Sequence, residues 1–276
     1  MIKQFLFSFS LMALVATTGN AQKLALTKGQ KVETIATSKM SMETMGQTIE
    51  NEGVATTDIE LKDITSDGFL FNNVIKHITT KITGAGQNIS FDSDKKEDMD
   101  GPMGQALKDK IGTTQEIQVD KNGKVANIKD SGEKTGAGGM SDMMGMGGDL
   151  MKGQAYPILI QLPARKIKAG DSWVDSTGTV ASIKTVTTYT LKTLTADGAQ
   201  VSFTSVMSKS GTMQQNGMDL QIDMSGTTKG ESTYEANTGI LKSSTGTTDI
   251  QGTVGVMGQN MPINGTVTVN MVVKKS

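Results

Sequence analysis

Residues 116–128 read EIQVDKNGKVANI, and this stretch indicates how much of the chain folds. Ile117 and Val119 alternate with polar residues before Asn122-Gly123, and apolar residues return after that pair. Alternation with a period of two is typical of a half-buried β-strand. Asn-Gly favours a tight hairpin turn, because both residues tolerate a positive φ angle. The stretch therefore predicts two antiparallel strands joined at Asn122-Gly123.

The same signals recur on both sides of this hairpin. Asp67-Gly68 and Asp197-Gly198 each separate two runs rich in Val, Ile and Thr, as hairpin turns do. We therefore predict a mainly β protein: a curved antiparallel sheet or half-barrel built from two related β-meanders, with one or two short covering helices. The preserved order of the turns indicates an internal duplication. The alternative is that any all-β chain shows such turns at intervals.

The sequence can be divided into a signal peptide and three predicted segments. Residues 1–21 read as a cleavable signal peptide, because Lys3 precedes an apolar run that ends in Gly19-Asn20-Ala21, a small-residue cleavage site. We expect one structural unit over residues 22–276. Its predicted segments, after the signal peptide at 1–21, are a first meander at 22–131 with a short helix near 103–111, a Gly/Met-rich connector with an apolar segment at 132–168, and a second meander at 169–276.

The signal peptide and the composition indicate where the protein is located and exclude several classes of function. A cleaved signal peptide predicts a periplasmic or secreted protein. The chain has no cysteine, which excludes disulfides, thiol catalysis and a lipid-anchored cysteine. No segment after the signal has the ~20 apolar residues that a membrane-spanning helix needs. The formal net charge of -1 gives no field that would favour nucleic acid.

Pro163 and the sequence Gly170-Asp-Ser-Trp173 stand at the opening of the second half. Together with the signal peptide, these residues resemble an uncharacterised family of exported Bacteroidetes β-proteins. That family is similar in shape to the periplasmic lipoprotein carriers, in which a strongly curved antiparallel sheet wraps a hydrophobic cavity covered by helices. The resemblance implies such a cavity here, and it implies no active-site residues.

Residues that could carry catalysis or bind a metal are few. His77 is the only histidine, and no G-x-S-x-G sequence presents a nucleophilic serine. The acidic run at residues 92–100 lacks the ligand spacing of a calcium-binding EF-hand loop, and Lys95-Lys96 interrupts it. We therefore predict no catalytic residues, no cofactor, no metal site and no enzymatic activity.

Methionine is the unusual component, with 19 in the chain. Met140, Met143, Met144 and Met146 have M-x-x-M and M-x-M spacings that suit Cu(I), a soft cation that binds thioethers. Methionine is also a pliable apolar side chain that adapts to irregular surfaces. Because other methionines are spread through the strand-like runs, we favour apolar contact over a metal centre.

These observations lead to one main hypothesis and two alternatives. We predict a non-enzymatic exported protein that binds or carries a lipid or another hydrophobic small molecule in a β-lined cavity. The alternatives are a structural or protein-interaction β module without a ligand, and Cu(I) buffering by the connector. The predicted ligand-binding residues are Met140, Met143, Met144, Met146, Met151, Ile158, Leu159 and Trp173.

Overall fold

The computed structural model describes residues 24–44, 46–84, 86–129, 150, 152–160, 163, 167–180, 183–215, 218–256 and 259–275. The predicted signal peptide at residues 1–21 lies outside the described residues. So do five of the predicted ligand residues, which are Met140, Met143, Met144, Met146 and Met151.

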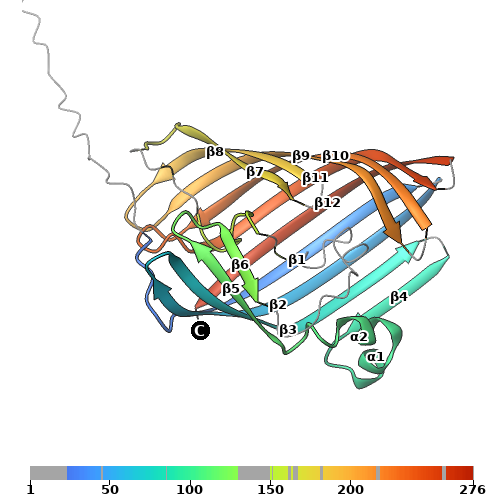
Figure 1. Ribbon diagram of the computed structural model, residues 1–276, viewed down its shortest axis with the longest axis horizontal. Coiled ribbons are helices and arrows are strands. Elements are labelled where there is room, and N and C mark those ends of the chain that lie inside the picture. The colour runs from blue at the N-terminus through green and yellow to red at the C-terminus, as the bar shows by residue number, and fades with distance from the viewer. Residues whose placement is uncertain are drawn as a thin grey trace, which may run out of the picture.

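The described residues form one antiparallel sheet of twelve strands, accompanied by two short helices (Figure 1). The first six strands are β1 (Lys31–Thr44), β2 (Gln47–Thr65), β3 (Gly68–Gly84), β4 (Gln87–Asp92), β5 (Thr114–Asp120) and β6 (Val125–Lys129). The last six are β7 (Ser172–Val180), β8 (Ile183–Leu194), β9 (Ala199–Gln215), β10 (Met218–Tyr234), β11 (Leu241–Val256) and β12 (Gln259–Lys275). The helices are α1 (Lys96–Asp100) and α2 (Pro102–Leu107).

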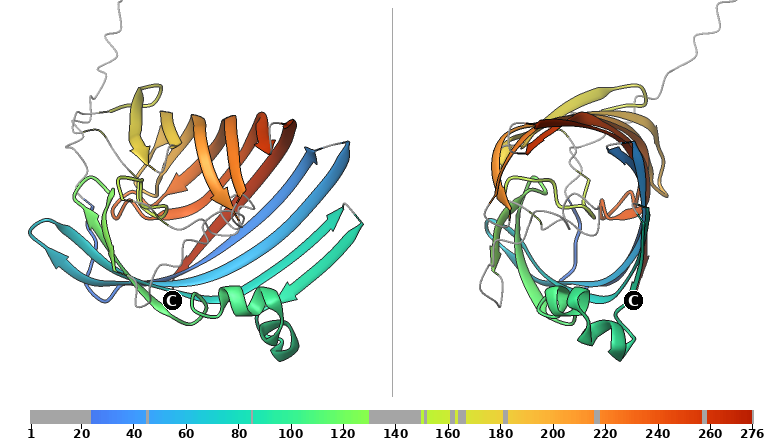
Figure 2. Two further views of the ribbon diagram at one scale, coloured as in Figure 1. Left: turned by 45° about the vertical axis from the view of Figure 1, so that its right-hand side comes forward. Right: turned by 90° about the vertical axis from the view of Figure 1, so that its right-hand side faces the viewer.

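The order of the strands across the sheet is β6-β5-β3-β2-β1-β12-β11-β10-β9-β8-β7, and β4 pairs with β3 beside β5. Within each half, most neighbours are hairpins of consecutive strands. The halves meet where β1 pairs with β12, from Val32 opposite Lys275 to Thr44 opposite Ile263. The sheet curves strongly, as Figure 2 shows from two sides. The predicted curved antiparallel sheet is confirmed, and both halves belong to one continuous sheet.

Both halves begin with the same local geometry. The amide of Gly29 donates to the carbonyl oxygen of Leu61 at 2.8 Å, and that of Gly170 donates to Leu191 at 2.8 Å. A β-bulge follows directly after each of these two leucines, in β2 and in β8. Bulges increase the local twist of a strand and bend it. The matching bulges therefore help the sheet to curve at the same end in both halves.

Both helices lie beside the end of β4, at an edge of the sheet (Figure 2). Helix α1 occupies part of the acidic run at residues 92–100, and Glu97 and Asp98 suit its first turn. Helix α2 begins at Pro102 and ends at Leu107, before the predicted end near Ile111. Ile111 instead forms a β-bridge to the edge of β3. Among the described residues, no helix is long and apolar enough to cross a membrane.

The main cluster of buried hydrophobic residues lies at one end of the sheet, which we call the packed end. Residues 152–160, here named the inner segment, run inside the curve there (Figure 2). The inner segment joins the halves: the amide of Tyr156 donates to Gly123 at 2.8 Å, and the amide of Ile160 donates to Gly239 at 3.0 Å. Gly123 belongs to the β5–β6 turn and Gly239 to the β10–β11 turn. Hence the first and second halves share one core.

The packed end also brings the two ends of the strand order close together. Lys124, in the β5–β6 turn, forms an ion pair of 2.6 Å with Asp175 of β7. The two side chains keep only 29% and 17% of their surface exposed, so water screens this pair less than a surface pair. The sheet therefore curves far enough at this end for its outermost strands to be linked.

Candidate functional site: the concave face

The concave face of the sheet can be assigned from alternation along β1. Val32, Thr34, Ser38 and Met40 are buried, whereas Lys39 is exposed. Val32 belongs to the same buried cluster as the inner segment, which lies inside the curve. Because side chains alternate across a strand, the even-numbered residues of β1 face the concave side. Cross-strand partners lie on the same face, so the register extends this assignment to every strand.

The methionines of the strands lie on this concave face. Met42 of β1 pairs with Gly265 of β12, which pairs with Ile250 of β11. Ile250 pairs with Gly226 of β10, and Gly226 pairs with Met207 of β9. Six strand methionines have described side chains, and all six have concave-face parity: Met40, Met42, Met207, Met224, Met261 and Met271.

Glycines lie opposite some of these methionines. A Cβ atom added to Gly226 would lie 3.0 Å from Cε of Met207, and one added to Gly265 would lie 3.4 Å from Cβ of Met42. Met207 thus extends along the sheet over the backbone of its glycine neighbour. Flexible thioether side chains over glycines make a low and adaptable apolar surface.

One row of paired residues crosses the concave face from β7 to β4. In order across the sheet it contains Trp173, Tyr189, Phe203, Gly230, Gly246, Val269, Ser38, Gly53, Thr80 and Phe91. Aromatic rings stand at both ends of this row. The residues between them are mostly small, and we call them the central row: Gly230, Gly246, Val269, Ser38, Gly53 and Thr80. Val269, in the central row, remains 36% exposed. Apolar surface is therefore accessible near the middle of the concave face.

Polar groups on the concave face of β10 and β11 are paired with one another. The hydroxyls of Thr228 and Thr248 lie 2.8 Å apart, and those of Ser232 and Ser244 also lie 2.8 Å apart. A hydroxyl with a partner costs much less to place against apolar groups than one without. These pairs are therefore compatible with an apolar occupant.

Two of the predicted ligand residues, Ile158 and Leu159, are part of the packed end. They are 2% and 4% exposed. The carbonyl oxygen of Ile158 accepts a hydrogen bond of 2.8 Å from the amide of Leu241, and Leu159 bridges to Ile240. Both side chains lie in the core that joins the halves, away from the central row.

Tyr156 anchors the inner segment. Its side chain is 1% exposed, and its ring centroid lies 4.7 Å from that of Phe71. Its hydroxyl donates to Oδ1 of Asn73 at 2.7 Å. Burial raises the pKa of Tyr156 above its usual value, although the hydrogen bond to Asn73 acts in the opposite direction. The phenol is therefore neutral and has a structural role.

Trp173, the third described ligand candidate, stands at the β7 end of the row of paired residues and packs against the core cluster of the packed end. Its indole stacks on Tyr189, with centroids 5.5 Å apart and an interplanar angle of 20°. The buried indole Nε1 has no hydrogen-bond acceptor among the described residues. A buried donor without a partner costs ~1–3 kcal/mol. An acceptor atom of a bound molecule would remove that cost.

The convex face carries ion pairs and hydrogen-bonded polar groups, beside exposed valines such as Val174 and Val206. Lys39 and Glu52 form an ion pair of 2.8 Å, with 73% and 59% of their side chains exposed. The hydroxyl of Thr245 donates to Oδ1 of Asn270 at 2.6 Å. A shallow pocket of ≈ 190 Å³ on this side is lined by Thr65, Leu70, Glu116, Gln118, Asn127 and Lys129. It is smaller than the ~300–1,000 Å³ typical of ligand sites.

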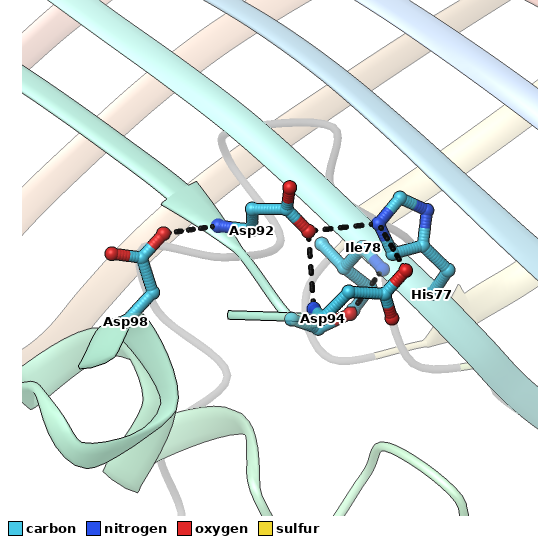
Figure 3. A network of polar contacts seen from close by, with 6 residues as sticks. His77, Ile78, Asp92, Asp94 and Asp98 are labelled. Atoms are coloured by element: carbon cyan, nitrogen blue, oxygen red, sulfur yellow. Dashed lines mark hydrogen bonds and ion pairs between the residues drawn. The ribbon is translucent and has the colours of Figure 1, made fainter. Parts of the chain in front are cut away.

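A constellation that the sequence did not predict lies at the edge of β3 (Figure 3). Nε2 of His77 lies 2.9 Å from Oδ1 of Asp92 and 3.6 Å from Oδ2 of Asp94. The hydrogen bond from His77 holds the pKa of Asp92 below its usual range, and the amide of Asp94 adds to the effect. The signal for this cluster was the lone histidine, but its partners follow fifteen or more residues later.

Comparison with known proteins places the chain in a family. The profile of a family of unknown function, DUF6263, matches residues 67–241. The chain belongs to this family. The match covers part of each half of the sheet, from the β2–β3 turn to the start of β11. No curated protein matches this DUF6263 protein.

Among solved structures, the sheet of this DUF6263 protein is similar to part of lipovitellin, in a structure that concerns lipid–protein interactions in lipovitellin. The TM-score is 0.50 at 12% identity, over 91% of this chain and 26% of that chain. The chain thus spans about a quarter of lipovitellin, and the likeness shows the fold alone.

Two weaker likenesses involve bacterial proteins. An outer membrane channel from Pseudomonas putida F1 has a TM-score of 0.27 at 6% identity, over 93% of this chain and 99% of that chain. The translocator domain of the autotransporter NalP from Neisseria meningitidis has a TM-score of 0.25 at 7% identity, over 91% and 90%. Scores this low bear on neither the fold nor the function of this protein.

Proposed function

We propose that this protein is exported, has no enzymatic activity, and binds a lipid or another elongated apolar molecule on its concave face. The placement of the strand methionines carries the proposal. All six with described side chains lie on the concave face, although a sheet offers two faces. Methionine is favoured where a surface must fit apolar partners of variable shape. The opposite face, with its ion pairs, is suited to water.

The central row offers apolar surface to a ligand. Gly246, Ser38 and Gly53 are small, and Val269 between them is 36% exposed. Burial of apolar surface contributes roughly 25 cal/mol per Å². A fatty-acid chain lying along the concave face would bury its own surface together with that of Val269 and the methionines.

Trp173 supports a polar contact at one end of such a ligand. Its indole N–H lacks an acceptor among the described residues, and fatty acids and phospholipids carry carboxylate, phosphate or ester oxygens. A ligand oxygen accepting from Nε1 would orient the apolar chain towards Phe203 and the central row. The likeness to lipovitellin, whose structure concerns lipid–protein interactions, adds support of a general kind.

A structural or interaction module without a ligand is the second candidate. The observation that favours it is the packed end, where Tyr156, Leu61 and Leu191 are fully buried without any ligand. This candidate predicts that the rest of the concave face is filled by the protein itself.

The test is ligand recovery and uptake. Protein purified gently from its host would be examined by native mass spectrometry, and delipidated protein would be titrated with a fluorescent fatty acid. We expect a co-purified lipid and saturable uptake that unlabelled lipid reverses. No co-purified lipid together with no saturable uptake would reject lipid binding and favour the module.

A further inference from the structure

The helices are inserted where β3 changes its partner. Residues 68–74 of β3 pair with β5, and residues 79–84 pair with β4. Between these two stretches the register of β3 against β2 shifts, because Thr57 pairs with Ile75 and Thr56 pairs with His77. Lys76 is therefore the extra residue of a β-bulge. Bulges reorient neighbouring side chains and are frequent next to functional sites.

His77 follows the bulge directly and faces the convex side of the sheet, where β4 ends. Asp92 is the last residue of β4, and Asp94 lies two residues beyond it. One ligand atom from each of the three side chains lies within 4.8 Å of the other two. The bulge, the strand end and the turn thus bring an imidazole and two carboxylates together (Figure 3).

The separations fit a metal coordination sphere. A cation ~2.1 Å from nitrogen and oxygen ligands requires neighbouring ligand atoms to be roughly 3.0 Å apart in octahedral geometry and about 3.4 Å apart in tetrahedral geometry. Nε2 of His77 lies 2.9 Å from the Asp92 oxygen and 3.6 Å from the Asp94 oxygen. All three ligand atoms lie within 4.8 Å of one another.

The backbone around these ligands is fixed by hydrogen bonds. The amide of Asp94 donates to Oδ1 of Asp92 at 3.0 Å, and the amide of Asp92 donates to Oδ2 of Asp98 at 2.8 Å (Figure 3). Ser93 binds β3 twice, since its amide donates to the carbonyl oxygen of Ile78 and its Oγ accepts from the amide of Ile78. Ligands held in this way lose little freedom on binding a cation.

We propose that His77, Asp92 and Asp94 bind one divalent cation of the Zn²⁺ type. An imidazole nitrogen with two carboxylates suits zinc, which in its open sites has three protein ligands and a water molecule. Calcium prefers six to eight oxygen ligands, which this set does not supply. Asp94 is 75% exposed, so a water molecule can reach the remaining position. The bound cation would tie β3 to the helical insertion at the edge of the sheet.

The single histidine of the chain makes a direct test possible. Untagged, chelator-treated protein with ¹⁵N-labelled histidine gives one set of imidazole NMR signals, and all of them report on His77. Titration with Zn²⁺ at pH 7.5 is expected to shift the Nε2 signal with saturation at one equivalent. The same amount of Ca²⁺ is expected to leave that signal in place.

Variants separate this site from weak surface binding. We expect Asp94→Asn to weaken Zn²⁺ binding at least ~10-fold, and its exposed position means that the fold should survive the change. Asp109→Asn, an exposed aspartate of the same insertion, is the matched control and should bind like the unchanged protein. A Nε2 signal that does not move with Zn²⁺, or equal Zn²⁺ affinity in Asp94→Asn and Asp109→Asn, would overturn the proposal.

Discussion

The packed end and the central row lie on the same concave face, yet they are built differently. Around the inner segment the face carries large apolar side chains such as Leu61, Phe71 and Leu191, each 2% exposed or less. Along the central row it carries glycine, serine and one half-exposed valine. One region fills the curve with large apolar side chains, and the other lines it with mostly small residues.

This difference suggests that the packed end mainly stabilises the fold and that the central row mainly contributes to ligand binding. Close packing at one end holds the two halves together through the inner segment and needs no ligand. Small residues along the central row contribute less to stability, since they bury less apolar surface. Substitutions should therefore affect unfolding at the packed end and ligand affinity near the central row.

The largest effect is expected from Tyr156→Ala. The change removes a ring packed on Phe71 and leaves Oδ1 of Asn73 without its hydroxyl donor. Removing a large buried aromatic ring costs about 3–5 kcal/mol, which urea denaturation would measure. Lys152→Ala, an exposed change in the same segment, should cost less than about 0.5 kcal/mol. Equal losses in the two variants would contradict the structural role of the inner segment.

Glycines of the central row allow a finer comparison. A Cβ at Gly230 would clash with the carbonyl oxygen of Thr245 and the ring of Phe203, whereas one at Gly246 would meet only side chains, at 3.3 Å or more. Gly230→Ala should therefore cost about 1–3 kcal/mol, and Gly246→Ala less. Thermal unfolding of the two variants checks the order, and the reverse order would show that the row is packed differently.

Two adjacent residues of β9 allow ligand binding to be compared on the two faces of the sheet. Met207 faces the concave side, and Val206 is 53% exposed on the convex side. Met207→Gln should weaken fatty-acid binding about 5-fold, or ~1 kcal/mol, because it replaces apolar contact by an amide. Val206→Gln should leave the affinity unchanged. If fluorescence titration gives the same affinity for both variants, the ligand does not lie over Met207.

The smallest effect concerns the convex side of the packed end. Hydrogen bonds from Lys62 and then Lys129 hold the pKa of Glu116 below its usual range. A lowered carboxyl pKa contributes stability above the unfolded-state pKa of about 4.3 and loses it as the pH falls. Glu116→Gln should therefore cost about 0.5 kcal/mol at pH 7 and less near pH 3. Urea melts at both pH values, with Glu50→Gln as a charge-loss control, would measure the difference.

Local signals predicted most of the sheet. Asn122-Gly123, Asp67-Gly68 and Asp197-Gly198 each lie at a turn between paired strands, because turn chemistry depends on adjacent residues. The pairing of β1 with β12 joins residues more than 200 positions apart, and no local pattern encodes it. The predicted duplication stays a prediction, supported by the matching hydrogen bonds at Leu61 and Leu191.

The candidate sites were less predictable for two physical reasons. The sequence shows that Met40 and Met42 lie on the same face of one strand. Only the pairing register between strands shows that Met207 and Met224 lie on that face too. The cluster around His77 depends on a bulge, which changes parity by one residue without a sequence signal. The connector methionines, Met140 to Met151, lie outside the described residues, and their predicted role stays a prediction.

The most direct test of the account uses the methyl groups of methionine. Protein labelled with ¹³C at these methyls would be mixed with a fatty acid that carries a nitroxide on its chain. We expect broadening of the concave-face signals from Met40, Met42, Met207, Met224, Met261 and Met271, with Met99 and Met103 of the helices unaffected. Broadening confined to the helix methionines, or none at all, would contradict a ligand on the concave face.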